Sequence, residues 1–198
     1  MLLALLQNLV DLLTGSVWTY PILFGICLGD AVIPALPSET AVIVCGIQAA
    51  RGQLSLGWVI AFAALGAFLG DNASYSAGHW LGRPVVKRFF SGEVAQGRLD
   101  WAERFLQQRG SYVLVVARFV PGGRTATTFT AGLVHLRWRT RFMPYIFVAA
   151  ILWSCYGALL GYLGGRTFRD QPIYALLLAL GIAAAITVGV EVLRRVRK

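Results

Sequence analysis

The sequence has little charge for its length. Of 198 residues, 18 are Lys or Arg and 9 are Asp or Glu. Charged residues make up 14% of the chain, against about a quarter of an average soluble domain. So few charges cannot solvate the surface of a soluble protein of this size, and 57% of the residues are hydrophobic. This composition argues against a cytosolic enzyme or a soluble nucleic-acid-binding protein and indicates a membrane protein.

Cysteine and histidine are scarce as well. Cys27, Cys45 and Cys155 are an odd number without C-x-x-C spacing, so we expect packed free thiols rather than disulfides or a zinc site. His79 and His135 stand in no metal-binding or phosphatase-like motif, and no G-x-S-x-G occurs. The sequence therefore predicts no enzyme, no catalytic residue, no metal and no cofactor.

Three long stretches of the chain contain at most one charged residue. One contains Asp71 as its only charged residue, and two others contain none. Because about 20 apolar residues in a helix span the hydrocarbon core, these stretches predict transmembrane helices at residues 55–81, 141–165 and 171–193. We expect an interfacial helix at 1–16 and an amphipathic helix at 93–109, which lies on the cytoplasmic surface or forms a soluble cap on a hairpin.

Two further apolar segments, residues 17–50 and 111–134, carry charge and helix breakers at their centres. Charge inside the membrane is costly, and proline removes a helix hydrogen bond. We therefore interpret each segment as a re-entrant hairpin of two short helices. The breaks are Pro34, Pro37 and Ser38 in the first hairpin and Pro121, Gly122 and Gly123 in the second.

The basic residues suggest the orientation of the chain. With both hairpins re-entrant, thirteen Lys and Arg fall on one face and three on the other. The positive-inside rule then places the basic tail, residues 194–198, in the cytoplasm. The net charge of +9 is thus explained by topology rather than by nucleic-acid binding.

The predicted elements form two similar units, each a hairpin followed by a crossing helix. The second unit enters from the opposite side, as in transporters built from inverted repeats. The predicted fold class is an all-α polytopic membrane protein of two inverted repeats with an extra C-terminal transmembrane helix. Both crossing helices also carry small residues at every fourth position, which we interpret as helix packing: Gly66, Gly70, Ser74, Gly78 and Gly82, then Gly157, Gly161 and Gly165.

Five charged side chains are predicted at membrane depth: Asp30, Glu39, Asp71, Arg118 and Arg124. Static ion pairs that pin the hairpins are one interpretation. Buried ion pairs stabilise poorly compared with apolar packing, however, so we favour a functional role. The planar arginine fork suits a phosphate, and a carboxylate beside it can take up or release a proton when a ligand binds.

The same segments resemble the DedA family, also called the VTT or SNARE-associated domain. The resemblance covers residues 17–165 and implies facing re-entrant hairpins and proton-motive-force-dependent lipid translocation. The family's essential acidic pair falls on Asp30 and Glu39 and its essential arginines on Arg118 and Arg124, although the first acidic position is more often glutamate. The motifs are Asp30 to Glu39 with Pro-x-x-Pro-Ser-Glu, Gly70-Asp71-x-x-x-Tyr75-x-x-Gly78-x-x-x-Gly82, Arg118-Phe119-x-Pro121-x-x-Arg124 and Ala131-Gly132.

These observations lead to a hypothesis of a multi-pass bacterial inner-membrane translocase for undecaprenyl phosphate or a phospholipid. Arg118 and Arg124 would bind the phosphate, Glu39 and Asp30 would couple protons, and Asp71 would steady the arginines or relay protons. A proton-coupled small-solute or ion transporter and a non-transporting membrane assembly factor are the alternatives. The helix at 171–193 faces either lipid or a second copy in a homo-oligomer.

Overall fold

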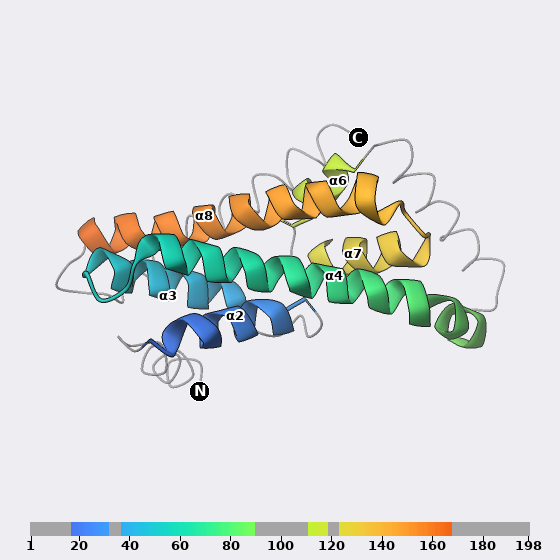
Figure 1. Ribbon diagram of the computed structural model, residues 1–198, viewed down its shortest axis with the longest axis horizontal. Coiled ribbons are helices and arrows are strands. Elements are labelled where there is room, and N and C mark those ends of the chain that lie inside the picture. The colour runs from blue at the N-terminus through green and yellow to red at the C-terminus, as the bar shows by residue number, and fades with distance from the viewer. Residues whose placement is uncertain (1–16, 32–36, 90–110, 119–122, 168–198) are drawn as a thin grey trace, which may run out of the picture.

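The computed structural model describes residues 17–31, 37–89, 111–118 and 123–167 (Figure 1). All regular elements in these ranges are helical, in agreement with the predicted all-α class. The predictions for residues 1–16, 93–109 and 171–198 fall outside them, as do those for Pro34, Pro121 and Gly122.

Two long helices run along the molecule, and shorter helices pack beside them (Figure 1). The helices are α2 (Thr19–Gly29), α3 (Ser38–Ala50), α4 (Leu56–Phe89), α6 (Tyr112–Ala117), α7 (Gly123–Leu133), the π-helical turn η1 (Trp138–Phe142) and α8 (Met143–Thr167). Helix α4 extends beyond the predicted end at residue 81. The predicted end rests on Arg83, the first charged residue after Asp71. A charge marks where the apolar sequence ends, but the helix continues past it.

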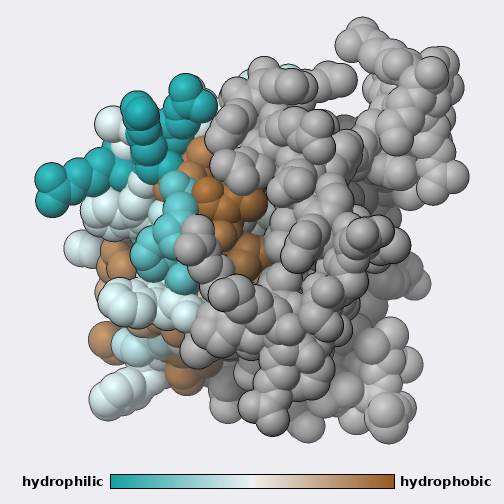
Figure 2. Space-filling view, turned by 90° about the vertical axis from the view of Figure 1, so that its right-hand side faces the viewer, coloured by the Kyte–Doolittle hydropathy of each residue, from teal (hydrophilic) through white to brown (hydrophobic). Residues whose placement is uncertain are grey.

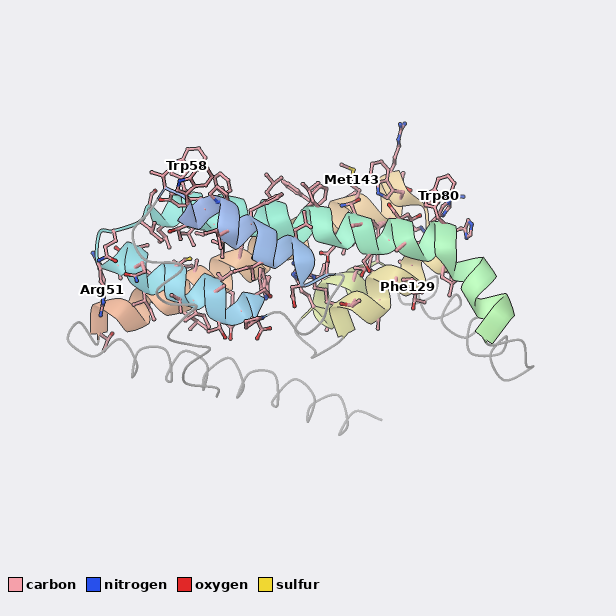
Figure 3. The ribbon with its side chains drawn as sticks, turned by 90° about the horizontal axis from the view of Figure 1, so that it is seen from below. Arg51, Trp58, Trp80, Phe129 and Met143 are labelled. Atoms are coloured by element: carbon pink, nitrogen blue, oxygen red, sulfur yellow. The ribbon has the colours of Figure 1, made fainter. Side chains whose placement is uncertain are left out.

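Two of these segments are long and apolar enough to cross a membrane: Leu56–Trp80 and Trp138–Thr167. On α4, the exposed Trp58 and Trp80 lie at opposite ends of the apolar segment (Figure 3). At 1.5 Å per residue they are about 33 Å apart, close to the thickness of a hydrocarbon core. Tryptophan is enriched at both membrane interfaces. Asp71 lies near the midpoint between the two tryptophans.

The two ends of the molecule carry different exposed arginines. Arg51 lies at the end marked by Trp58 (Figure 3). The opposite end, where η1 lies, faces the viewer in Figure 2, and hydrophilic side chains gather along one edge of its described surface beside a hydrophobic area. Arg137, Arg139 and Arg141, in and directly before η1, are exposed.

Helices α2 and α3 form the first hairpin, and α6 and α7 form the second. The first hairpin begins beside the start of α4, where the Ser55 backbone N–H donates to the Tyr20 hydroxyl at 2.9 Å. Helix α2 then runs toward the middle of α4, and α3 returns to Arg51. The second hairpin occupies the other half of the molecule (Figure 1). Both hairpin tips therefore lie near the middle of the long helices.

Each arm of a hairpin packs against a different long helix. In the first hairpin, α2 packs on α4 and α3 packs on α8. In the second hairpin, α6 packs on α8 and α7 packs on α4. The first arm thus lies on the long helix that follows it in the sequence, and the second arm lies on the other long helix. One apolar core fills each half, with Leu23, Val42 and Val59 in the first and Leu114, Phe142 and Ile146 in the second.

The predicted packing role of the glycine rows is confirmed. A Cβ at Gly66 would overlap the Phe24 carbonyl oxygen on α2, and one at Gly78 would overlap the Phe129 carbonyl oxygen on α7. On α8, a Cβ at Gly161 would overlap a carbonyl oxygen of α3. These glycines let the hairpin backbones approach the long helices closely, as in other membrane helix pairs. Helices α2 and α7 consequently follow one another along the same long helix.

Candidate functional site

The hairpin tips place charged residues at equivalent positions. Asp30 directly follows α2, and Arg118 directly follows α6. Glu39 is the second residue of α3, and Arg124 is the second residue of α7. The first hairpin therefore presents two acids at the positions where the second hairpin presents two arginines.

Asp71 connects both arginines to the middle of α4. Its side chain is fully buried. One carboxylate oxygen, Oδ2, accepts a hydrogen bond from Nη1 of Arg118, and the other, Oδ1, accepts from Nε of Arg124 at 2.6 Å. A single carboxylate thus binds both guanidinium groups near the midpoint of the apolar segment.

Arg124 uses all three of its side-chain nitrogens. Besides Asp71, its Nη1 donates to Asp30 Oδ2 at 3.0 Å, and its Nη2 donates to the backbone carbonyls of Ala67 and Cys27 at 3.1 and 3.4 Å. Asp30 also accepts a hydrogen bond from the Ser38 hydroxyl at 2.7 Å. The pairing compensates a local conflict, because Asp30 lies at the negative end of α2 and Arg124 at the positive end of α7. Arg124 therefore ties both hairpins to α4.

Arg118 is satisfied on one side only. Its side chain is 1% exposed, and Nη1 is bound by Asp71. The atoms Nε and Nη2 are buried and have no hydrogen-bond partner among the residues that the structure describes. These two nitrogens form one edge of the planar guanidinium, the edge that binds a carboxylate or phosphate through two parallel hydrogen bonds. A buried donor without a partner costs about 1–3 kcal/mol, so this open edge is the place in the cluster where a ligand would gain most.

Trp153 of α8 lies against both arginines. The guanidinium carbon is 5.1 Å from the indole centroid for Arg118 and 6.0 Å for Arg124, within the range of cation–π attraction. The side chain of Trp153 is buried. Sequence reasoning missed this residue, because a tryptophan in an apolar helix is as easily placed against lipid. Its position near the centre of the crossing helix, away from the interfaces that tryptophan favours, was the available signal.

Four of the five predicted charges come together in one charge cluster: Asp30, Asp71, Arg118 and Arg124. The fifth, Glu39, is exposed. Within the ranges that the structure describes, it forms no ion pair, although it is close enough to Asp30, Arg124 and Tyr156 to interact with them electrostatically.

The predicted breaks coincide with helix ends wherever the structure describes them. Pro37 caps the start of α3, Ser38 is its first residue, and Gly123 begins α7. The broken helices thereby bring the ends of four arms to one place. The two aspartates and two arginines of the charge cluster balance in charge, which makes their burial tolerable.

Comparisons with known proteins agree with these features. The VTT domain matches residues 36–163. Protein DedA of Escherichia coli K12 is 30% identical over 188 residues, which cover 92% of this chain and 85% of that protein. An uncharacterized membrane protein of Synechocystis, slr0232, is 34% identical over 78% of this chain and 70% of its own length.

The inner membrane protein YqjA of Escherichia coli K12 is 27% identical over 85% of this chain and 83% of its own length. No solved structure matches the chain. The domain match covers more than half of the sequence and includes Glu39, the tip of the second hairpin and most of α8. The chain belongs to the VTT domain family of membrane proteins, the family of DedA.

Proposed function

We propose that the protein is a lipid translocase of the bacterial inner membrane, driven by the proton motive force. It moves a phosphate-bearing lipid, such as undecaprenyl phosphate or a phospholipid. The headgroup passes between the two hairpin tips while the acyl or prenyl chain stays in the bilayer. Arg118 binds the phosphate and Arg124 contributes positive charge beside it. Asp30 and Glu39 carry protons, and Asp71 holds the arginines in place.

The open edge of Arg118 is the observation that carries this proposal. Within the described ranges, a permanently charged guanidinium with two unpartnered nitrogens lies buried near the middle of an apolar segment. Two phosphate oxygens match this edge with two charge-assisted hydrogen bonds. A purely structural ion-pair cluster would gain stability by closing the edge, so its availability favours an anionic ligand.

The packing supports an inverted repeat around this site. The exchange of partners between hairpins and long helices is the pattern that a two-fold relation between repeats produces. The same relation places the acids of one hairpin opposite the arginines of the other. Broken helices that meet near the midplane form the substrate sites of many transporters.

Proton coupling follows from the mixture of acids and arginines. An acidic side chain that loses an arginine partner to a phosphate binds a proton more readily. Asp30 shares Arg124 with Asp71, and Glu39 lies exposed beside them. Headgroup binding at the cluster is therefore linked to proton uptake at the first hairpin.

A bacterial inner-membrane location is supported by the name of YqjA, an inner membrane protein. The exposed Arg137, Arg139 and Arg141 lie directly before Met143, which is far from Arg51 in Figure 3. With the basic tail on the same side as these three arginines, the positive-inside rule gives a cytoplasmic C-terminus.

Substitution of Arg118 by lysine tests the proposal. Lysine keeps the charge but lacks the planar fork, so movement of phosphatidic acid with a fluorescent acyl chain should slow about tenfold or more in proteoliposomes that carry a proton gradient. The matched control is Arg139→Lys, the same change at an exposed position. Wild-type lipid movement by a folded Arg118→Lys protein would contradict the proposal. Uptake of inorganic phosphate without lipid movement would instead identify a small-solute transporter.

A further inference from the structure

The two hairpins form one ion pair with each other, and a second pair of oppositely charged residues stands at the equivalent positions. Asp30 and Arg118 occupy the same position, directly after the first arm, and Glu39 and Arg124 both occupy the second position of the second arm. Asp30 of the first hairpin therefore corresponds to Arg118 of the second, and Arg124 of the second corresponds to Glu39 of the first. The equivalent of the Asp30–Arg124 pair is thus a pair between Arg118 and Glu39. The first pair is formed at 3.0 Å. In the described part of the chain, the second pair is not formed.

Both members of the unformed pair are available. Arg118 has an open edge at Nε and Nη2, and its remaining nitrogen is bound by Asp71. Glu39 is exposed and lies outside the ion pairs of the charge cluster. A carboxylate is the other common ligand that binds an arginine edge through two parallel hydrogen bonds.

Helix α8 brings the two residues toward one place. Trp153 stacks against Arg118, and Tyr156 interacts electrostatically with Glu39. Residues three apart on a helix are neighbours on its surface. Arg118 and Glu39 thus lie near positions about one turn apart on α8 and come from different hairpins, so their pairing requires a movement of the first turn of α3 toward Arg118.

We propose that Glu39 and the anionic lipid headgroup occupy the open edge of Arg118 in turn. Glu39 is then an intramolecular competitor of the headgroup as well as a proton carrier. This inference rests on the proposed function and adds to it a closed state in which the Arg118 edge is filled. A phosphate that takes the edge displaces the carboxylate, and departure of the phosphate allows the carboxylate to return.

Binding of dodecyl phosphate to the purified full chain in neutral maltoside micelles tests the competition. Glu39→Gln removes the competing carboxylate and should tighten binding about tenfold, the effect of removing a modest competing interaction. If Glu39 only carried protons, its effect on affinity would not act through the Arg118 edge and would persist when Arg118 is replaced. The gain should disappear in the Glu39→Gln, Arg118→Lys double variant, because both changes act on one site.

Asp30→Asn is the matched control. It removes the same charge from the same hairpin, but Asp30 is paired with Arg124 and does not compete for Arg118. It should tighten binding by a smaller factor, through Arg124, and this smaller gain should persist in the Asp30→Asn, Arg118→Lys double variant. Equal tightening in Asp30→Asn and Glu39→Gln would show a general electrostatic effect and would overturn the inference, as would an unchanged affinity in Glu39→Gln.

Lipid movement by the wild-type protein separates this inference from the proposed function. If the wild type moves labelled phosphatidic acid but Glu39→Gln binds dodecyl phosphate no more tightly, only the inference fails. If Glu39→Gln binds more tightly but the wild type moves no lipid, the proposed function fails and the competition stands. If neither protein binds dodecyl phosphate, both are wrong.

Discussion

Individual residues in the charge cluster have unequal tasks. Arg124 has partners at every nitrogen, from the first hairpin and from α4. In the part of the chain that the structure describes, Arg118 has one hydrogen-bond partner and an open edge. Trp153 lies against both guanidinium groups, within the range of cation–π attraction. We therefore expect Trp153 to act as a positioning residue for Arg118.

Trp153→Leu removes the aromatic face while keeping an apolar side chain. Cation–π attraction in a desolvated site accounts for about a tenfold effect, so half-maximal lipid movement should require about tenfold more labelled phosphatidic acid in the vesicles. Trp153→Phe retains a ring and should restore most of the lost affinity. Trp58→Leu is the control, because Trp58 is 61% exposed and far from the charge cluster. An unchanged lipid dependence in folded Trp153→Leu would exclude the positioning role.

The sequence was sufficient to predict the five charges, because an ionised side chain within an apolar stretch is costly enough to stand out. It was not sufficient to predict how they pair. The choice of Asp71 as the shared partner depends on how α4 is rotated relative to the hairpin tips. Of the two carbonyls that bind Arg124, that of Cys27 belongs to the last turn of α2 and that of Ala67 lies within α4. Glu39, predicted as part of the constellation, lies exposed beside the charge cluster.

At the scale of helices, close backbone contact determines how the hairpins are held. The breaks at Pro37 and Gly123 were predictable, because proline and glycine interrupt helices through local backbone chemistry. The exchange of packing partners between α3 and α7 was not, because it depends on the relative placement of four helices. The spacing of the glycines indicated close packing without identifying the partner.

Gly161→Leu should separate α3 from α8. A side chain at this position meets the Ile43 carbonyl oxygen, which is backbone and cannot turn aside. Overpacking of this kind costs about 1–3 kcal/mol, so the temperature of thermal unfolding in detergent should fall by several degrees. Gly25→Ala on α2 is the control, because a Cβ there has nothing within 4 Å. Unchanged unfolding of Gly161→Leu would mean that α3 and α8 are not held in contact.

For the whole molecule, the arrangement of arginines and tryptophans defines two membrane faces. Trp58 and Arg51 mark one face, and Trp80 with the exposed arginines of η1 marks the other (Figure 3). The repeat relation and the cytoplasmic C-terminus in our proposal both require that these faces lie on opposite sides of the bilayer.

Labelling of introduced cysteines would establish the orientation. In intact cells without an outer membrane barrier, a membrane-impermeant maleimide should modify Gln53→Cys and not Arg139→Cys. Inverted vesicles should give the reverse pattern, because Arg139 belongs to the predicted cytoplasmic face. The protein without an introduced cysteine gives the background labelling of its three native cysteines. Labelling of both positions from one side would contradict the crossing by α4.

The shared use of Asp71 also has a consequence for biosynthesis. Asp30 and Asp71 are made with the first half of the chain, whereas the arginines that pair with them, Arg118 and Arg124, are made later. The ribosome therefore releases two acids toward the bilayer before any of these basic partners exists. We expect α4 to remain beside the insertion machinery, or to carry a protonated Asp71, until the second hairpin emerges and the two halves enter their final arrangement together.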